Sequence, residues 1–109
     1  RVCNNFERGM LSAVVHPDFL NPDKRYLYVY YSFKKHDGCE QRFDVGPVDR
    51  VSRFKLNEDF TVDDSVPELV FFNTPEQGTW IHNGGDLKFG KDGLLYVTVG
   101  DGGTRPNFE

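Results

Sequence analysis

Apolar residues gather along the chain in six short runs, which are separated by polar turns rich in glycine, proline and aspartate. Tyr26–Phe33 is apolar at odd and even positions, which predicts a strand buried on both faces. Asp49–Leu56 alternates instead, as in a strand exposed on part of one face. No run has the length and period of a long helix, so the pattern predicts an antiparallel all-β protein. The predicted strands are Met10–Val15, Tyr26–Phe33, Asp49–Leu56, Glu68–Phe72, Leu87–Phe89 and Leu94–Val99.

One theme of a short strand, a turn and an aromatic-rich strand occurs twice, in MLSAVVHPDF with RYLYVYYS and in GDLKFGKDG with LLYVTVGD. Such repetition is typical of a β-propeller, whose blades are four-stranded antiparallel sheets. The first four strands, within residues 10–72, are expected to form one blade, and the hairpin within 84–100 begins the next. About one and a half blades cannot close a propeller. Residues 1–109 are therefore interpreted as a fragment of a single propeller domain.

The last two predicted strands flank the turn 90–93 (GKDG), and Asp-Gly between alternating runs is a strong hairpin signal. If the turn is centred between Lys91 and Asp92, paired residue numbers sum to 183, and His82 lies opposite Asp101. A bulge at Gly93 would shift this register by one residue. Glycine pairs at 84–85 and 102–103 follow the histidine and the aspartate. A ligand is expected to approach the backbone closely there.

Charge and hydropathy narrow the possible partners. The formal net charge of −4 comes from 13 basic and 17 acidic residues, and no basic stripe is present. The sequence therefore argues against nucleic acid or an anionic membrane surface as a partner. The longest apolar runs have the length of a strand, so none is expected to span a bilayer.

Two cysteines, Cys3 and Cys39, are 36 residues apart. A disulfide between them and a pair of free exposed thiols are equally compatible with this spacing. The chain contains no CxxC, HxxxH or HExxH motif, which argues against a zinc site. The acidic residues of 58–64 lack the spacing of a calcium loop. The sequence thus predicts no metal site within this chain.

Four segments in order, ERGMLSAVVHPDF, YLYVYYS, RVSRFKL and HNGGDLKFGKDGLLYVTVGDGG, resemble the glucose/sorbosone dehydrogenase family. This family comprises soluble quinoprotein sugar dehydrogenases and hedgehog-interacting-protein-like proteins. The resemblance implies a six-bladed β-propeller, and for the enzymes oxidation of the anomeric hydroxyl of an aldose to the lactone. It also implies two cofactors: PQQ (pyrroloquinoline quinone), which accepts the hydride, and Ca2+, which holds and polarises the quinone. Most residues that bind these cofactors would lie outside this chain.

The resemblance also assigns roles to individual residues. His82 falls on the position of the catalytic base, and Asp101 on the carboxylate that orients it. The residues that the resemblance and the local sequence suggest for contact with cofactor or substrate are Glu7, Trp80, Asn83, Gly84 and Arg105. Without the resemblance, the simpler reading of His82 is a loop histidine hydrogen-bonded to a turn, and Asp101 can be read as a cap of the Gly102-Gly103 turn.

Two positions depart from the pattern of the enzymes. Glu7 stands where the enzymes commonly have glutamine, and Glu7-Arg8-Gly9 is similar to the hedgehog-interacting branch. Ile81 precedes the histidine, where the enzymes can have an acidic residue.

Three functions are compatible with these observations. The first is an extracellular or periplasmic quinoprotein sugar dehydrogenase with a small sugar substrate. The second is a secreted, non-catalytic propeller that binds a protein or glycan partner. The third is a structural extracellular module that supports neighbouring domains. In each case the rest of the propeller is expected to pack against this chain.

Overall fold

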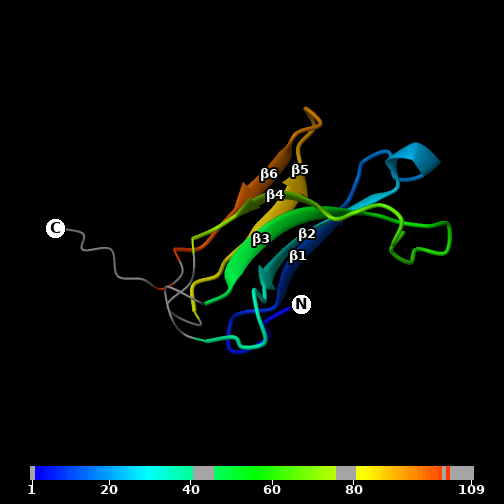
Figure 1. Ribbon diagram of the computed structural model, residues 1–109. Coiled ribbons are helices and arrows are strands. Elements are labelled where there is room, and N and C mark those ends of the chain that lie inside the picture. Colours follow the sequence, from blue (N-terminus) through cyan, green and yellow to red (C-terminus); the bar gives the residue numbers. More distant parts are fainter. Residues whose placement is uncertain (1, 41–45, 76–80, 102, 104–109) are drawn as a thin grey trace.

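The computed structural model describes residues 2–40, 46–75, 81–101 and 103 (Figure 1). These residues form an all-β chain with a short 3-10 helix in the first long connection. The elements are β1 (Met10–Val15), η1 (Pro22–Lys24), β2 (Tyr26–Phe33), β3 (Val48–Lys55), β4 (Leu69–Asn73), β5 (Asp86–Phe89) and β6 (Leu95–Thr98). Each strand coincides with a predicted one to within one residue at either end, which confirms the predicted fold class. Within the described ranges, no helix has both the length and the apolar character needed to cross a membrane.

Strands β1 to β4 form a four-stranded sheet in sequence order, and each neighbouring pair is antiparallel. At its centre, Tyr28 pairs with Val14 of β1 on one side and with Arg53 of β3 on the other. The predicted four-stranded meander is therefore confirmed. The connection that carries η1 lies at the end of the sheet away from the N-terminal loop (Figure 1).

The β5–β6 hairpin has a register that differs by one residue from the centred turn. Asp86 pairs with Thr98 and Phe89 with Leu95, so paired numbers sum to 184. Gly93 N donates to Gly90 O at 3.0 Å, and Gly93 adopts a φ of +80°. A type I turn followed by a left-handed glycine makes a three-residue loop with a G1 bulge. The centred register is wrong for the strands themselves, and the shifted alternative is confirmed.

The core lies between one face of the four-stranded sheet and the hairpin, because β5 packs against β1 and β2 (Figure 1). Tyr28 and Tyr30 of β2, Val51 of β3 and Leu87 of β5 form its buried centre. Their neighbours in β2, Val29 and Tyr31, are also buried. Successive side chains of a strand point to opposite faces, so β2 is covered on both sides, as its sequence predicts.

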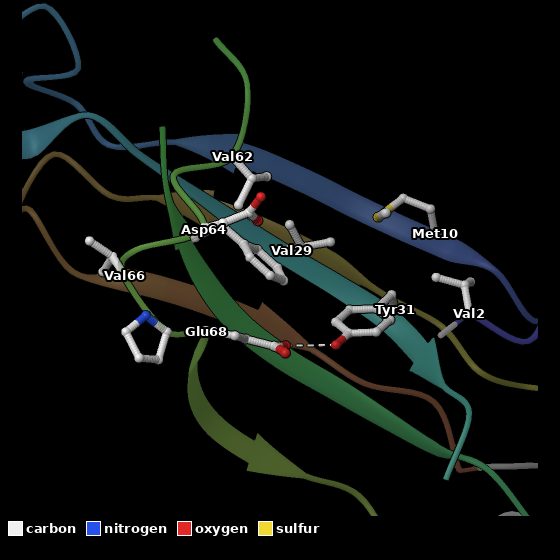
Figure 2. A pocket seen from close by; sticks show the side chains of 10 residues that line it. Val2, Met10, Val29, Tyr31, Val62, Asp64, Val66 and Glu68 are labelled. Carbon is white, nitrogen blue, oxygen red and sulfur yellow. Dashed lines mark hydrogen bonds between the residues drawn. The ribbon is translucent and has the colours of Figure 1, made fainter. Parts of the chain in front are cut away.

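A groove lies on the other face of the sheet. Val29 and Tyr31 form its floor, and the segment from Val62 to Glu68 forms one wall, as Figure 2 shows. Its volume is about 540 Å3. None of the predicted site residues that the structure describes (Glu7, His82, Asn83, Gly84 and Asp101) is among the residues that line it.

Cys3 and Cys39 form a disulfide, which resolves the alternative that their spacing left open. Cys3 is fully buried, and its N–H donates to the carbonyl of Ser32 at the end of β2. The bridge therefore fixes the N-terminal loop to the end of the sheet at which β2 finishes and β3 begins.

Candidate functional site

His82 and Asp101 are in direct contact at the open end of the hairpin. Nδ1 of His82 lies 2.9 Å from Oδ1 of Asp101, and the side chains are 57% and 56% exposed. A carboxylate at Nδ1 favours the tautomer that carries its proton there, which leaves the lone pair on Nε2. The backbone N–H of Gly103 lowers the pKa of the Asp101 carboxyl, and the hydrogen bond with His82 lowers it further. Asp101 is thus ionised at neutral pH and able to orient the imidazole.

The two residues meet because two irregularities of the hairpin cancel. Beyond the Asp86–Thr98 pair, Gly100 N donates to Asn83 O at 3.2 Å. The residue numbers of this contact sum to 183, the value for the centred turn, and not to the 184 of the paired strands. The first arm therefore carries one extra residue between these contacts. This bulge offsets the one at Gly93 and brings His82 back to the level of Asp101. The predicted contact is correct, although the regular register that suggested it is not.

The backbone of His82 has a φ of +58°, in the left-handed region that few residues other than glycine, asparagine and aspartate adopt. Such a conformation persists only where neighbouring contacts hold it. The N–H of His82 donates to Oε2 of Glu7 at 2.5 Å, across 75 residues of sequence. The structure thus places Glu7, which was predicted to contact cofactor or substrate, directly at the backbone of the histidine.

Asn83 fixes the backbone on the other side of His82 and is 1% exposed. Its carbonyl accepts from the Tyr30 hydroxyl at 2.7 Å and from Gly100 N. Its Nδ2 donates to Oδ2 of Asp49 at 3.2 Å. Burial raises the pKa of the Tyr30 hydroxyl, and Asp49 raises it further, so Tyr30 remains a hydrogen-bond donor at neutral pH.

Asp49 is the buried carboxylate beneath the site, and the sequence analysis did not single it out. Ser32 Oγ donates to its Oδ1 at 2.7 Å, and its charge acts on the buried guanidinium of Arg8. Burial lowers the pKa of Arg8, and the Asp49 carboxylate opposes that shift. Arg8 also donates to the carbonyl of Cys39 at 3.0 Å. One signal in the sequence could have identified Asp49: it is a carboxylate at the start of a strand with buried neighbours. Because buried carboxylates are rare unless they are paired, such a residue indicates a buried polar cluster.

The glycines of the site let the two arms approach each other closely. A Cβ on Gly100 would lie 1.7 Å from the carbonyl oxygen of His82, and one on Gly84 would lie 2.5 Å from Gly100 N. At these positions the backbone of the facing arm takes the space that a side chain would need. This packing gives Gly84 a structural role, and its contact with a ligand stays a prediction.

We expect Gly100→Ala to destabilise the hairpin by about 1–3 kcal/mol or more, because the new methyl group must displace backbone. The matched control is Gly93→Asn, since Gly93 has open space around it and asparagine tolerates its positive φ. Hydrogen exchange of the β5–β6 amides in the full-length protein measures the effect. Equal exchange rates in the two variants would contradict the close-packing argument.

Comparison with known proteins adds to this geometry. Residues 1–109 match the sequence profile of the Glucose / Sorbosone dehydrogenase family. The chain belongs to this family. The Hedgehog-interacting protein of Homo sapiens is 34% identical over 102 residues, covering 88% of this chain and 13% of that protein. The Mus musculus Hedgehog-interacting protein has the same identity and coverage.

The chain spans only 13% of the length of these curated relatives. Since the family is a β-propeller family, the meander β1–β4 is part of a propeller. The number of blades, and the assignment of residues 10–72 and 84–100 to successive blades, stay predictions.

The described residues bring His82 and Asp101 together but do not form a complete cofactor site. Among them, no group of three or more His, Cys, Asp or Glu side chains is placed to hold a metal ion. Arg8, a basic residue near the site, is buried, donates to the Cys39 carbonyl and interacts with the Asp49 carboxylate. Trp80 and Arg105, predicted to contact cofactor or substrate, lie outside the described residues.

Proposed function

We propose that this chain supplies the proton-handling part of a quinoprotein sugar dehydrogenase of the propeller family. The observation that carries the proposal is the contact between His82 Nδ1 and Asp101 Oδ1 at 2.9 Å, on exposed side chains. A second support is the family match over the whole chain. The disulfide supports an extracellular or periplasmic location, because disulfides persist in oxidising compartments.

In the proposed reaction, Nε2 of His82 takes the proton of the anomeric hydroxyl while the carbon–oxygen double bond of the lactone forms. Asp101 holds the ring in the required tautomer and stabilises the imidazolium that results. Glu7 and Asn83 hold the backbone of His82 on its two sides. PQQ with Ca2+, when bound, supplies the hydride acceptor, and the residues that hold this pair are expected elsewhere in the full-length protein.

The direct test is aldose-dependent dye reduction by the full-length protein supplied with Ca2+ and PQQ. Turnover with an aldose, and none with the corresponding lactone, is the expected result. Quinone binding is followed separately by titration of its absorbance. A protein that binds no quinone under these conditions would rule out the dehydrogenase proposal.

A second candidate is a non-catalytic extracellular propeller that binds a protein partner. The 34% identity to proteins named for an interaction with Hedgehog favours it. So does Glu7, which stands where the enzymes commonly have glutamine and places a second carboxylate beside the His82–Asp101 pair. Negative charge there opposes binding of an anionic quinone.

Two measurements separate the candidates. The first is binding of the full-length protein to a purified Hedgehog protein on a sensor surface. The second is quinone titration of Glu7→Gln, which removes the charge and keeps an acceptor oxygen for His82 N. Equal quinone binding by the wild type and by this variant favours the dehydrogenase, because the Glu7 charge then does not oppose the quinone. Hedgehog binding combined with no quinone binding by either form favours the partner-binding propeller.

A further inference from the structure

A cluster of four polar side chains lies beneath His82, on the hairpin side of the sheet. It comprises Tyr30, Ser32, Asp49 and Asn83, and each is at most 1% exposed. Asp49 is the only one of the four with a formal charge. It accepts from Ser32 at 2.7 Å, from Tyr30 at 3.3 Å and from Asn83 Nδ2 at 3.2 Å. Burying a carboxylate is costly, and these three donors together with the nearby Arg8 guanidinium offset that cost for Asp49.

We propose that Asp49 is a positioning residue, which holds His82 against Asp101 by anchoring Asn83 through the Asn83 amide. The role rests on the proposed proton transfer by His82. Asn83 follows His82 directly, and its side chain and its carbonyl are both bound in the buried cluster. The left-handed backbone of His82 is thereby held from below by Asn83 and from the N-terminal loop by Glu7.

The His82 ring has little packing of its own among the described residues. More than half of its side chain faces solvent, so little packing restricts the ring directly. Within the described part of the chain, the position of this ring then depends on its backbone and on its hydrogen bond with Asp101. Asp49 is not the hydrogen-bond partner of the His82 ring. It acts on His82 through the neighbouring residue, Asn83.

The same sheet contains a matched control on its other face. Glu68 accepts from the hydroxyls of Tyr31 and Ser52, each at 2.6 Å, and Figure 2 shows the Tyr31 contact. Asp49 likewise accepts from a tyrosine and a serine, Tyr30 and Ser32. Glu68 lies in the groove and does not contact the His82 site. Glu68→Gln therefore perturbs a similar tyrosine–serine–carboxylate cluster without touching the proposed route.

The test uses a charge swap in the full-length protein. Asn83→Asp places a carboxylate against Asp49, and the repulsion is expected to displace the backbone that carries His82. Asp49→Asn added to Asn83→Asp reverses the donor and acceptor and restores a hydrogen bond across the same gap. If Asn83→Asp does not fold, Asn83→Ala removes the amide donor without adding charge and is expected to act in the same direction.

The readout is the tautomer of His82, read from its imidazole nitrogen chemical shifts in histidine-labelled protein and assigned by comparison with His82→Asn. The Nδ1–H form is expected in the wild type, in the swapped double variant and in Glu68→Gln. The Nδ1–H form is expected to be lost in Asn83→Asp. In this variant kcat should be lower by about 10- to 100-fold, because the imidazole of His82 is displaced from the position that the reaction needs. An unchanged tautomer in folded Asn83→Asp or Asn83→Ala would overturn the inference.

Failure of the inference and failure of the proposed function give different results. The tautomer is measured without turnover, so it tests the anchoring even if no aldose is oxidised. Absence of oxidation by the wild-type protein rejects the dehydrogenase. An Asn83→Asp variant with wild-type kcat and tautomer rejects the role of Asp49 alone.

Discussion

Replacement of His82 by asparagine is expected to lower kcat for aldose oxidation by about 10²- to 10⁴-fold, the usual contribution of a general base. Asparagine is chosen because it tolerates the φ of +58° at this position. Its amide can also donate to Asp101, so the hairpin end stays closed. An amide has no basic nitrogen at neutral pH, and proton removal from the sugar is lost. Steady-state dye reduction and quinone titration, made on the same protein samples, separate loss of chemistry from loss of cofactor.

The control for this variant is His16→Asn. His16 accepts from the N–H of Asp18 through Nδ1, in the turn after β1. An asparagine side chain can accept the same bond. Among the described residues, the hydrogen bonds that hold His82 come from Asp101 and Glu7 and do not involve His16. This variant should retain wild-type turnover. Retained turnover in His82→Asn as well would show that His82 is not the base.

Removal of the disulfide by Cys3→Ser with Cys39→Ser is expected to destabilise the protein by about 4 kcal/mol in the chain-entropy estimate for a loop of this length. The bridge closes a separation of 36 residues that includes β1 and β2. Thermal unfolding of the full-length protein, followed by circular dichroism, provides the measurement. Reductant serves as the control: it should lower the midpoint of the wild type toward that of the double variant, and leave the variant unchanged. Equal midpoints of wild type and variant without reductant would contradict the prediction.

The same variant should also affect the site. Arg8 donates to the carbonyl of Cys39, and Glu7 accepts from the N–H of His82, so the bridge anchors the loop that carries both. We therefore expect the double serine variant to lose part of its turnover at temperatures at which it is still folded.

The strands were predictable because each depends mainly on local alternation and on turns of glycine, proline and aspartate. β2 shows this most clearly, since its run of apolar residues at both parities predicted burial on both faces. The hairpin register was harder to predict, because it depends on the left-handed conformation of Gly93 and on a second bulge at Gly84 and Gly85. Each irregularity alone would have separated His82 from Asp101. Their cancellation depends on backbone geometry that residue spacing does not encode.

The buried cluster could not be read from the sequence for a different reason. Asp49 and Asn83 are 34 residues apart, and their contact forms only when the hairpin packs on the sheet. The same is true of Glu7, whose acceptor role depends on a loop held by a disulfide. Residue types and the family resemblance identified the histidine–aspartate pair, whereas long-range packing determines what holds that pair in place.

The contact between Glu7 and His82 has a practical consequence for dissecting the protein. An expression fragment that begins at Met10 would retain all six strands and the His82–Asp101 pair. It would lack Cys3 and Glu7, and with them the bridge and the acceptor for the His82 N–H. A truncation designed from strand boundaries alone would therefore give a correct sheet with an altered site, and negative activity data from it would say little about the intact protein.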